Sequence, residues 1–188
     1  MKRLLLAFAA VACATQQQPP PTPMNSGSSG APTAASGSQM GSGGSQMASG
    51  QSQMTFHATL RPDEEVPKPQ LDPGVSPSGS ATFTVMGNTI TWQAQVTGLS
   101  SPYTAAHIHA GAAGVAGPVI VMLEMNPGAP GTASGQGTID ASSIKGKNPD
   151  GSPMTMEGLV AALQQGNTYV NVHTQNNKKG EARGQITQ

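Results

Sequence analysis

Apolar and polar residues alternate along most of the chain after Thr55. In residues 79–86 (GSATFTVM) and 89–96 (TITWQAQV), apolar side chains take alternate positions, which is the pattern of a β-strand with one buried face. Gly87-Asn88 between them predicts a two-residue hairpin turn. Shorter strands are predicted over residues 56–60, 105–109, 119–123, 134–139, 169–174 and 182–186. Short strands at this spacing predict two antiparallel sheets in a Greek-key β-sandwich or barrel.

One segment follows the helical period instead of the strand period. An apolar stripe predicts a helix over residues 153–165, with Ser152 as its cap, Pro153 at its first position and Gly166 as its stop. The stripe consists of Met156, Leu159, Val160 and Leu163. The predicted fold class is therefore all-β with one short helix. Its core is mainly Val, Ile, Leu and Ala, with Phe83, Trp92 and Tyr169 as the large side chains.

The N-terminus has the pattern of a targeting segment. Lys2 and Arg3 precede the apolar run Leu4–Ala12, which is too short to span a bilayer and suits the central part of a signal peptide. Residues 1–13 therefore predict export, to the periplasm or to an anchored position at the outer membrane. Cys13 stands where a bacterial lipoprotein carries its lipidated cysteine, although ordinary cleavage after Ala14 is the alternative.

Residues 14–53 consist almost entirely of Gln, Pro, Ser, Gly, Thr, Ala and Met. Such a segment buries too little apolar surface to offset its ordering entropy, so it predicts a disordered tether to a folded domain at residues 54–188. Within the tether the tripeptide Ser-Gln-Met recurs every seven residues, ending at Met40, Met47 and Met54. No apolar partner positions lie between the repeats, so this is no coiled-coil heptad.

Charge narrows the classes of partner. The 188 residues carry nine basic and nine acidic side chains, and only 10% of the chain is charged. A nucleic-acid partner is excluded because no basic patch is present. The expected contact with a membrane is limited to a lipid anchor at Cys13. The acidic run Asp63-Glu64-Glu65 predicts a solvated loop.

Three of the four histidines share one strand pattern. His107 and His109 flank Ile108, and His173 follows Asn171 and Val172, so alternation places the histidines on the outer face of the sheet and the apolar residues inside. If the two strands are neighbours, the imidazoles converge at about 5 Å. Three neutral imidazoles that leave one coordination position of the ion open are a ligand set that suits copper or zinc. The alternative is a solvated polar face.

Three blocks of the sequence resemble the CHRD domain, named for chordin and found in many bacterial exported proteins. They read FHATLRPDEEVP, AAHIHAGAAGVAGPVIVML and YVNVHTQNNKKGEARGQI. The resemblance covers about residues 55–187. It implies a CHRD-type β domain but little about biochemical activity.

A more distant resemblance links these motifs to the Cu/Zn superoxide dismutase barrel. In that family a His-x-His pair and a later histidine bind copper on the outer face. The resemblance implies that His107, His109 and His173 hold copper and that Arg183 sits near the open position. Asn171, which shares a strand face with His173, is a further candidate to support the site. The loop AAGVAGP after Gly111 contains no histidine or aspartate, so the zinc ligands and the bridging histidine of the dismutase are absent.

Methionine favours copper over zinc in this chain. Thioethers are soft ligands that select Cu(I), so the Met40, Met47 and Met54 repeat predicts an arm that collects Cu(I). The alternative is that the repeat is a low-complexity linker in which methionine has no role in metal binding. Further candidate ligands within the domain are His57, Met122, Met154 and Met156, although Met156 also fits the apolar stripe of the helix.

These patterns predict an exported copper-binding protein for storage, delivery or resistance, whose partners are a copper ion and another copper protein of the envelope. A dismutase-like copper oxidoreductase is the second hypothesis. An adhesion or scaffold module without metal is the third.

Overall fold

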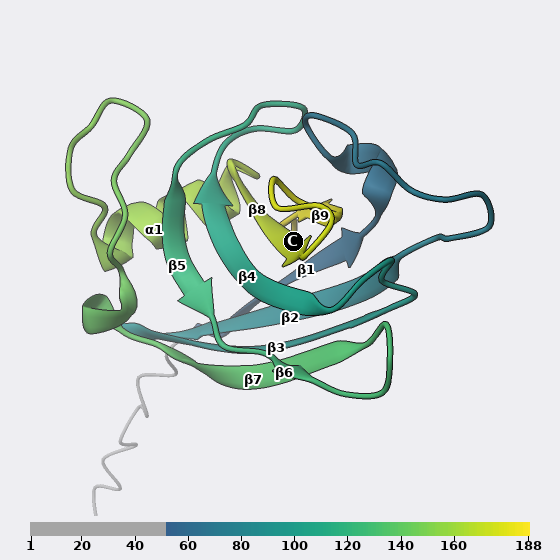
Figure 1. The fold of residues 1–188 in the computed structure, drawn as a ribbon. Helices are drawn as coiled ribbons and strands as arrows, with labels where there is room; N and C mark the ends of the chain where they lie inside the picture. The colour runs from purple at the N-terminus through teal and green to yellow at the C-terminus, as the bar shows by residue number, and fades with distance from the viewer. Residues whose placement is uncertain (1–51) are drawn as a thin grey trace, which may run out of the picture. The chain divides into compact units, whose positions relative to one another are not determined.

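The computed structural model describes residues 52–188, which form two antiparallel β-sheets and one α-helix (Figure 1). The predicted signal segment, Cys13, Met40 and Met47 lie outside the described residues. Within the described part, no helix has the length and apolar character that crossing a bilayer requires. The elements are β1 (Met54–Leu60), η1 (Pro62–Glu64), β2 (Ser78–Met86), β3 (Thr89–Thr97), β4 (Tyr103–Ala110), β5 (Val119–Leu123), β6 (Asn126–Pro127), β7 (Ala133–Ile139), η2 (Ala141–Ser143), α1 (Met156–Gln164), β8 (Thr168–Thr174) and β9 (Ala182–Gln185).

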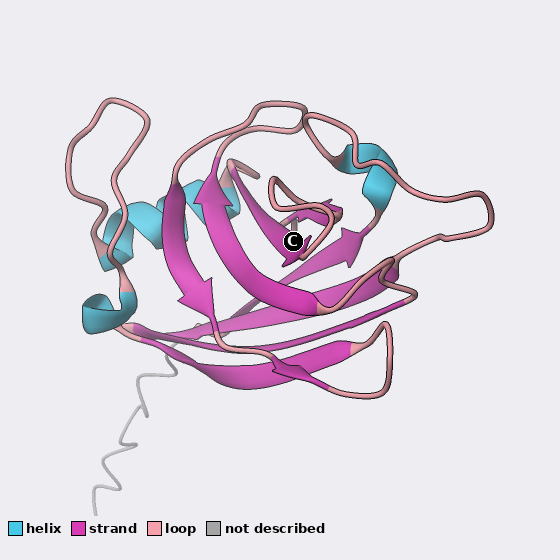
Figure 2. Ribbon diagram, viewed as in Figure 1, coloured by secondary structure: helices cyan, strands magenta, loops and turns pink. Residues whose placement is uncertain are grey.

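The two sheets enclose one core (Figure 2). The first has the strand order β1-β2-β3-β7-β6 and the second β5-β4-β8-β9. They are joined at one edge, where bridges link His57 to Thr187 and Arg61 to Arg183. The inner faces of both sheets contribute apolar side chains, among them Phe83, Ile108 and Val172. The prediction of an all-β fold with two antiparallel sheets and one short helix is confirmed.

The predicted strands form at nearly their predicted positions. The hairpin at Gly87-Asn88 is confirmed, since Met86 pairs with Thr89, and Gly87 has a φ of 56° that such a turn requires. The two-residue strand β6 was not predicted, because it consists of Asn126 and Pro127, and proline is depleted in strands. The two short 3-10 helices were also missed.

The predicted start of the helix is wrong by one turn. Helix α1 begins at Met156, and the side chain of Thr155 caps it by accepting a hydrogen bond from the Gly158 N–H. Ser152 instead belongs to the preceding turn, where its hydroxyl donates to Asp150 and accepts from Asn148. The predicted stop is confirmed, since Gly166 follows the helix with a φ of 65°.

Candidate metal centre

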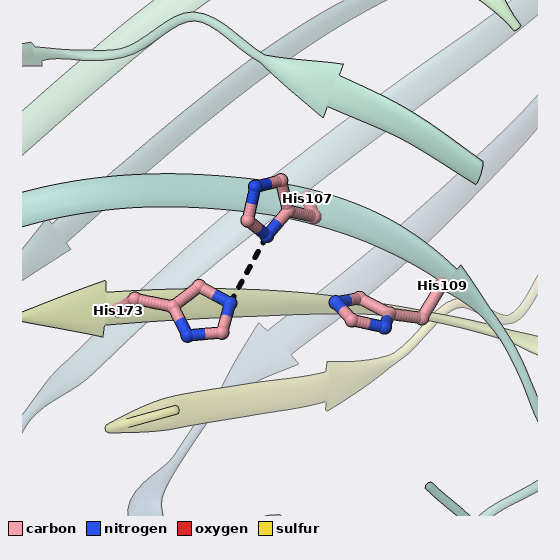
Figure 3. Close-up of side chains that lie close together, drawn as sticks. All are labelled: His107, His109 and His173. Carbon is pink, nitrogen blue, oxygen red and sulfur yellow. Dashed lines mark hydrogen bonds between the residues drawn. The ribbon is translucent and has the colours of Figure 1, made fainter. Parts of the chain in front are cut away.

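The three predicted ligands lie together on the outer face of the second sheet (Figure 3). Strands β4 and β8 are neighbours, and their register sets His107 opposite Asn171 and His109 opposite Tyr169. His173 follows Asn171 on the same face, diagonal to His107. The ring centroid of His107 lies 4.9 Å from that of His173 and 5.7 Å from that of His109. The condition on which the convergence of the three rings depended, that the two strands are neighbours, is therefore met.

Hydrogen bonds to backbone carbonyls fix the tautomers of two rings. The Nδ1–H of His109 donates to the Gly117 carbonyl at 2.9 Å, and that of His173 donates to the Lys178 carbonyl at 3.1 Å. Each ring therefore presents an unprotonated Nε2. The Nε2 of His173 lies 3.0 Å from Nδ1 of His107 (Figure 3). The Nε2 of His109 is buried and has no hydrogen-bond partner among the described residues.

The site keeps its imidazoles neutral. Burial lowers the pKa of all three histidines, and at His107 the neighbouring His173 and His109 lower it further, to about 4. At His109 the bond to Gly117 opposes this effect, and the charge of Arg183 adds to it. At pH 7 the three rings are therefore deprotonated, as a metal ligand must be.

Acidification is expected to destabilise the metal-free domain. The pKa of His107 falls from 6.5, the ordinary value that applies to the unfolded chain, to about 4 in the folded domain, so the unfolded chain binds more protons between these values. Stability contributed by the neutral ring is full above pH 6.5 and falls as the pH drops towards 4. Urea unfolding of the wild type and of His107→Gln at pH 7.5 and pH 5 checks this. The variant should lose less stability on acidification; an equal loss would contradict the assignment.

An aromatic stack supports His109 from behind. The ring of Tyr169 lies against that of His109, with centroids 4.8 Å apart and planes 12° from parallel. The guanidinium carbon of Arg183 lies 3.4 Å from the Tyr169 centroid. Since β8 lies between β4 and β9, Tyr169 stands between His109 and Arg183. Arg183 is 2% exposed and therefore does not reach the open side of the site, where the dismutase resemblance placed it.

Gly117, in the loop between β4 and β5, forms hydrogen bonds with both His109 and Tyr169. Its carbonyl accepts from His109, and its N–H donates to the hydroxyl of Tyr169 at 3.0 Å. A Cβ at this position would lie 1.6 Å from the Ala110 carbonyl oxygen, so only glycine fits here. The close approach of the loop to the end of β4 thus sets the orientation of two rings.

Comparison with known proteins agrees with the motifs of this site. The family model of the CHRD domain matches residues 56–186, which include all three histidines. The chain belongs to the CHRD family. Searches of curated proteins and of solved structures gave no match. The likeness of this CHRD protein to the dismutase therefore remains a resemblance of short motifs.

The other predicted ligands of the CHRD domain are dispersed. Met122 is 60% exposed and lies directly opposite His107 on β5, on the same face of the sheet. Met154 and Met156 are buried in the core, because the apolar stripe of α1 and the turn before it pack inward. Both are therefore excluded as ligands at the three-histidine site.

Two further candidates lie away from the three histidines. His57 is exposed on β1 in the other sheet. Met54 belongs to β1, where it pairs with Val85, and its sulfur accepts a hydrogen bond from Gln164. It is therefore a partly buried part of the fold and no member of a free arm.

A buried carboxyl group beside the histidines was not predicted. Glu65 is 3% exposed, so the solvated loop predicted for Asp63-Glu64-Glu65 is wrong at this residue. Burial raises its pKa to about 8, against the opposing charge of Arg183. The amide of Asn171 donates to Glu65 Oε2 at 3.4 Å, while Glu65 Oε1 and Asn171 Oδ1 have no partner within residues 52–188. Glu65 Oε1 and Asn171 Oδ1 are both acceptors when Glu65 is ionised. Protonation of Glu65 adds an O–H group that can donate a hydrogen bond between them.

Tyr169 was predicted as a large core side chain, and its burial is confirmed. It is buried, but on the outer face, under the Gly111–Pro118 loop and the side chain of Arg183. The strand alternation contained this signal, since Tyr169 has the same parity as Asn171 and His173.

Proposed function

We propose that this CHRD domain is a copper-binding protein that holds one ion between His107, His109 and His173. The observation that supports it is the convergence of one nitrogen from each ring within 4.8 Å. Three ligands at about 2 Å from one ion lie within about 4 Å of one another, so a closure of about 1 Å is enough. The buried, unpaired Nε2 of His109 fits such an ion.

Copper is favoured over zinc by the sulfur near the site. Divalent copper binds nitrogen ligands more tightly than zinc does, and thioethers prefer Cu(I). The thioether of Met122 lies across from His107, and two further methionines stand in the Ser-Gln-Met repeat, at Met40 and Met47. In this proposal the repeat collects Cu(I) and the domain holds it. Copper bound here supplies a redox-active Lewis acid.

Storage, delivery or resistance to copper in the cell envelope is the role that we propose for such a site. The apolar N-terminal run and Cys13 support an exported protein with a lipid anchor. An exchange partner for the ion would be a second copper protein of the same compartment. The site is open on one side, because His107 and His173 are partly exposed while His109 is buried, which suits transfer of the ion.

Copper stoichiometry of the full chain tests this proposal. All variants carry Met40→Leu and Met47→Leu, so that the repeat contributes no binding. One equivalent of tightly bound copper is expected in this background, and none after His107→Ala with His109→Ala. His57→Ala, which removes an exposed histidine from the other sheet, should keep the full equivalent. Equal copper content in the double alanine variant and its parent would refute the proposal.

A further inference from the structure

The ligand set contributes no negative charge. Its three members are imidazoles, which bind a metal ion as neutral ligands, and no carboxylate belongs to the group. A bound Cu(I) would bring one uncompensated positive charge into this partly buried site, and a bound Cu(II) would bring two. The charges around the rings therefore affect the two oxidation states unequally.

A fixed cation lies behind one of the rings. Arg183 donates to the Ala112 carbonyl at 2.9 Å and stacks on Tyr169, which in turn stacks on His109. The side chain is almost fully buried, so water screens its charge poorly. The stack therefore places a poorly screened positive charge on the far side of Tyr169 from His109.

The nearest carboxyl groups do not cancel that charge. Glu65 is neutral at pH 7, because burial raises its pKa to about 8. Glu181 is ionised, but its oxygens accept from Ser100, Thr174 and Asn177, on the opposite side of β8 from the rings. Glu64 accepts from the backbone N–H of Gln185, whereas the guanidinium of Arg183 donates to Ala112 and to the Gln185 side chain. Lys178 and Lys179 in the loop beside His173 add further positive charge.

We propose that Arg183, acting through Tyr169, makes the three-histidine site selective for Cu(I) over Cu(II). This inference rests on the proposed copper function and specifies the oxidation state that the site retains. Arg183 is a tuning residue in this scheme, since it contacts neither the ion nor a ligand directly. The exposed thioether of Met122 across from His107 favours the same oxidation state.

The expected size of the effect follows from Coulomb's law. Two unit charges roughly 10 Å apart at an effective dielectric constant of about 20 change an equilibrium constant on the order of tenfold. Cu(II) carries one unit of charge more than Cu(I). Removal of the Arg183 charge should therefore raise the affinity for Cu(II) about tenfold relative to that for Cu(I).

Affinities of the full chain for both ions test the proposal. Cu(I) is measured by competition with a chromophoric Cu(I) chelator under anaerobic reducing conditions, and Cu(II) by competition with glycine. Each variant carries Met40→Leu and Met47→Leu. Arg183→Met should shift the ratio of affinities towards Cu(II), and Arg183→Lys should restore part of the wild-type ratio. Lys145→Met, which removes an exposed charge elsewhere, should leave the ratio unchanged.

An unchanged ratio in a folded Arg183→Met variant would overturn the selectivity proposal while leaving copper binding intact. Absence of binding at the histidines of the wild type would instead overturn the proposed function. If Arg183→Met does not fold, the midpoint potential of the copper-loaded wild type tests the selectivity proposal instead. It should lie above that of copper with free imidazole in the same buffer, and a value at or below that reference would contradict the proposal.

Discussion

Replacement of Glu181 by leucine is expected to destabilise the domain by about 4 kcal/mol, because it leaves several buried donors without an acceptor. The carboxylate is fully buried and accepts from the backbone N–H and hydroxyl of Ser100, the hydroxyl of Thr174 and the amide of Asn177. These bonds hold the β8–β9 loop, whose Lys178 carbonyl orients His173. Copper affinity should therefore fall with stability.

Urea unfolding at pH 7 measures this effect, with Glu157→Leu as the matched control. Glu157 is exposed in the first turn of α1, so its loss should cost less than about 1 kcal/mol. The pKa of Glu181 is lowered, since its hydrogen bonds outweigh the opposing effect of burial, the largest single cause. The ionised Glu181 carboxylate therefore contributes to the free energy of unfolding above pH 4.5, the ordinary glutamate pKa. This contribution is lost as the pH falls below 4.5. A Glu181→Leu variant as stable as the control would contradict this role.

The second large effect is expected at Gly117. Gly117→Ala places a Cβ 1.6 Å from the Ala110 carbonyl oxygen, and the nearest atoms are all backbone, so no flexible side chain can give way. The loop must move away from β4, so the bonds from Gly117 to His109 and Tyr169 are lost together. We expect a loss of about 3 kcal/mol in unfolding free energy and weaker copper binding.

Gly158→Ala is the matched control for this substitution. Gly158 lies in α1, where its Cβ would approach only side-chain atoms, the Met154 sulfur at 3.2 Å and the Thr155 hydroxyl at 3.4 Å. Alanine favours the helix by about 1 kcal/mol over glycine. The measurements are urea unfolding and copper competition on both variants. If Gly117→Ala binds copper as tightly as Gly158→Ala does, the loop does not position His109.

Strand alternation was enough to place the three histidines on one outer face of the sheet. The positions of His107, His109 and His173 relative to the valines and Ile108 indicated one outer face, and the register of β4 and β8 confirms it. The adjacency of these two strands stayed a condition of the prediction and could not be derived from spacing, because 66 residues separate His107 from His173.

The surroundings of the triad were harder to predict because they depend on loops. Glu65 is buried by contact with Asn171, which lies 106 residues away along the chain. An acidic run before a proline has the same composition whether it is solvated or buried. Likewise, Arg183 stacks on Tyr169 only because β9 pairs with β8, and no periodicity within either segment specifies that pairing.

Anomalous diffraction at the copper edge, from crystals of the full chain grown with copper, tests the proposed copper site most directly. One strong peak is expected within about 2 Å of a nitrogen of each of His107, His109 and His173. Copper found only elsewhere on the protein, or three rings that stay free of metal at saturating copper, would contradict the proposed site.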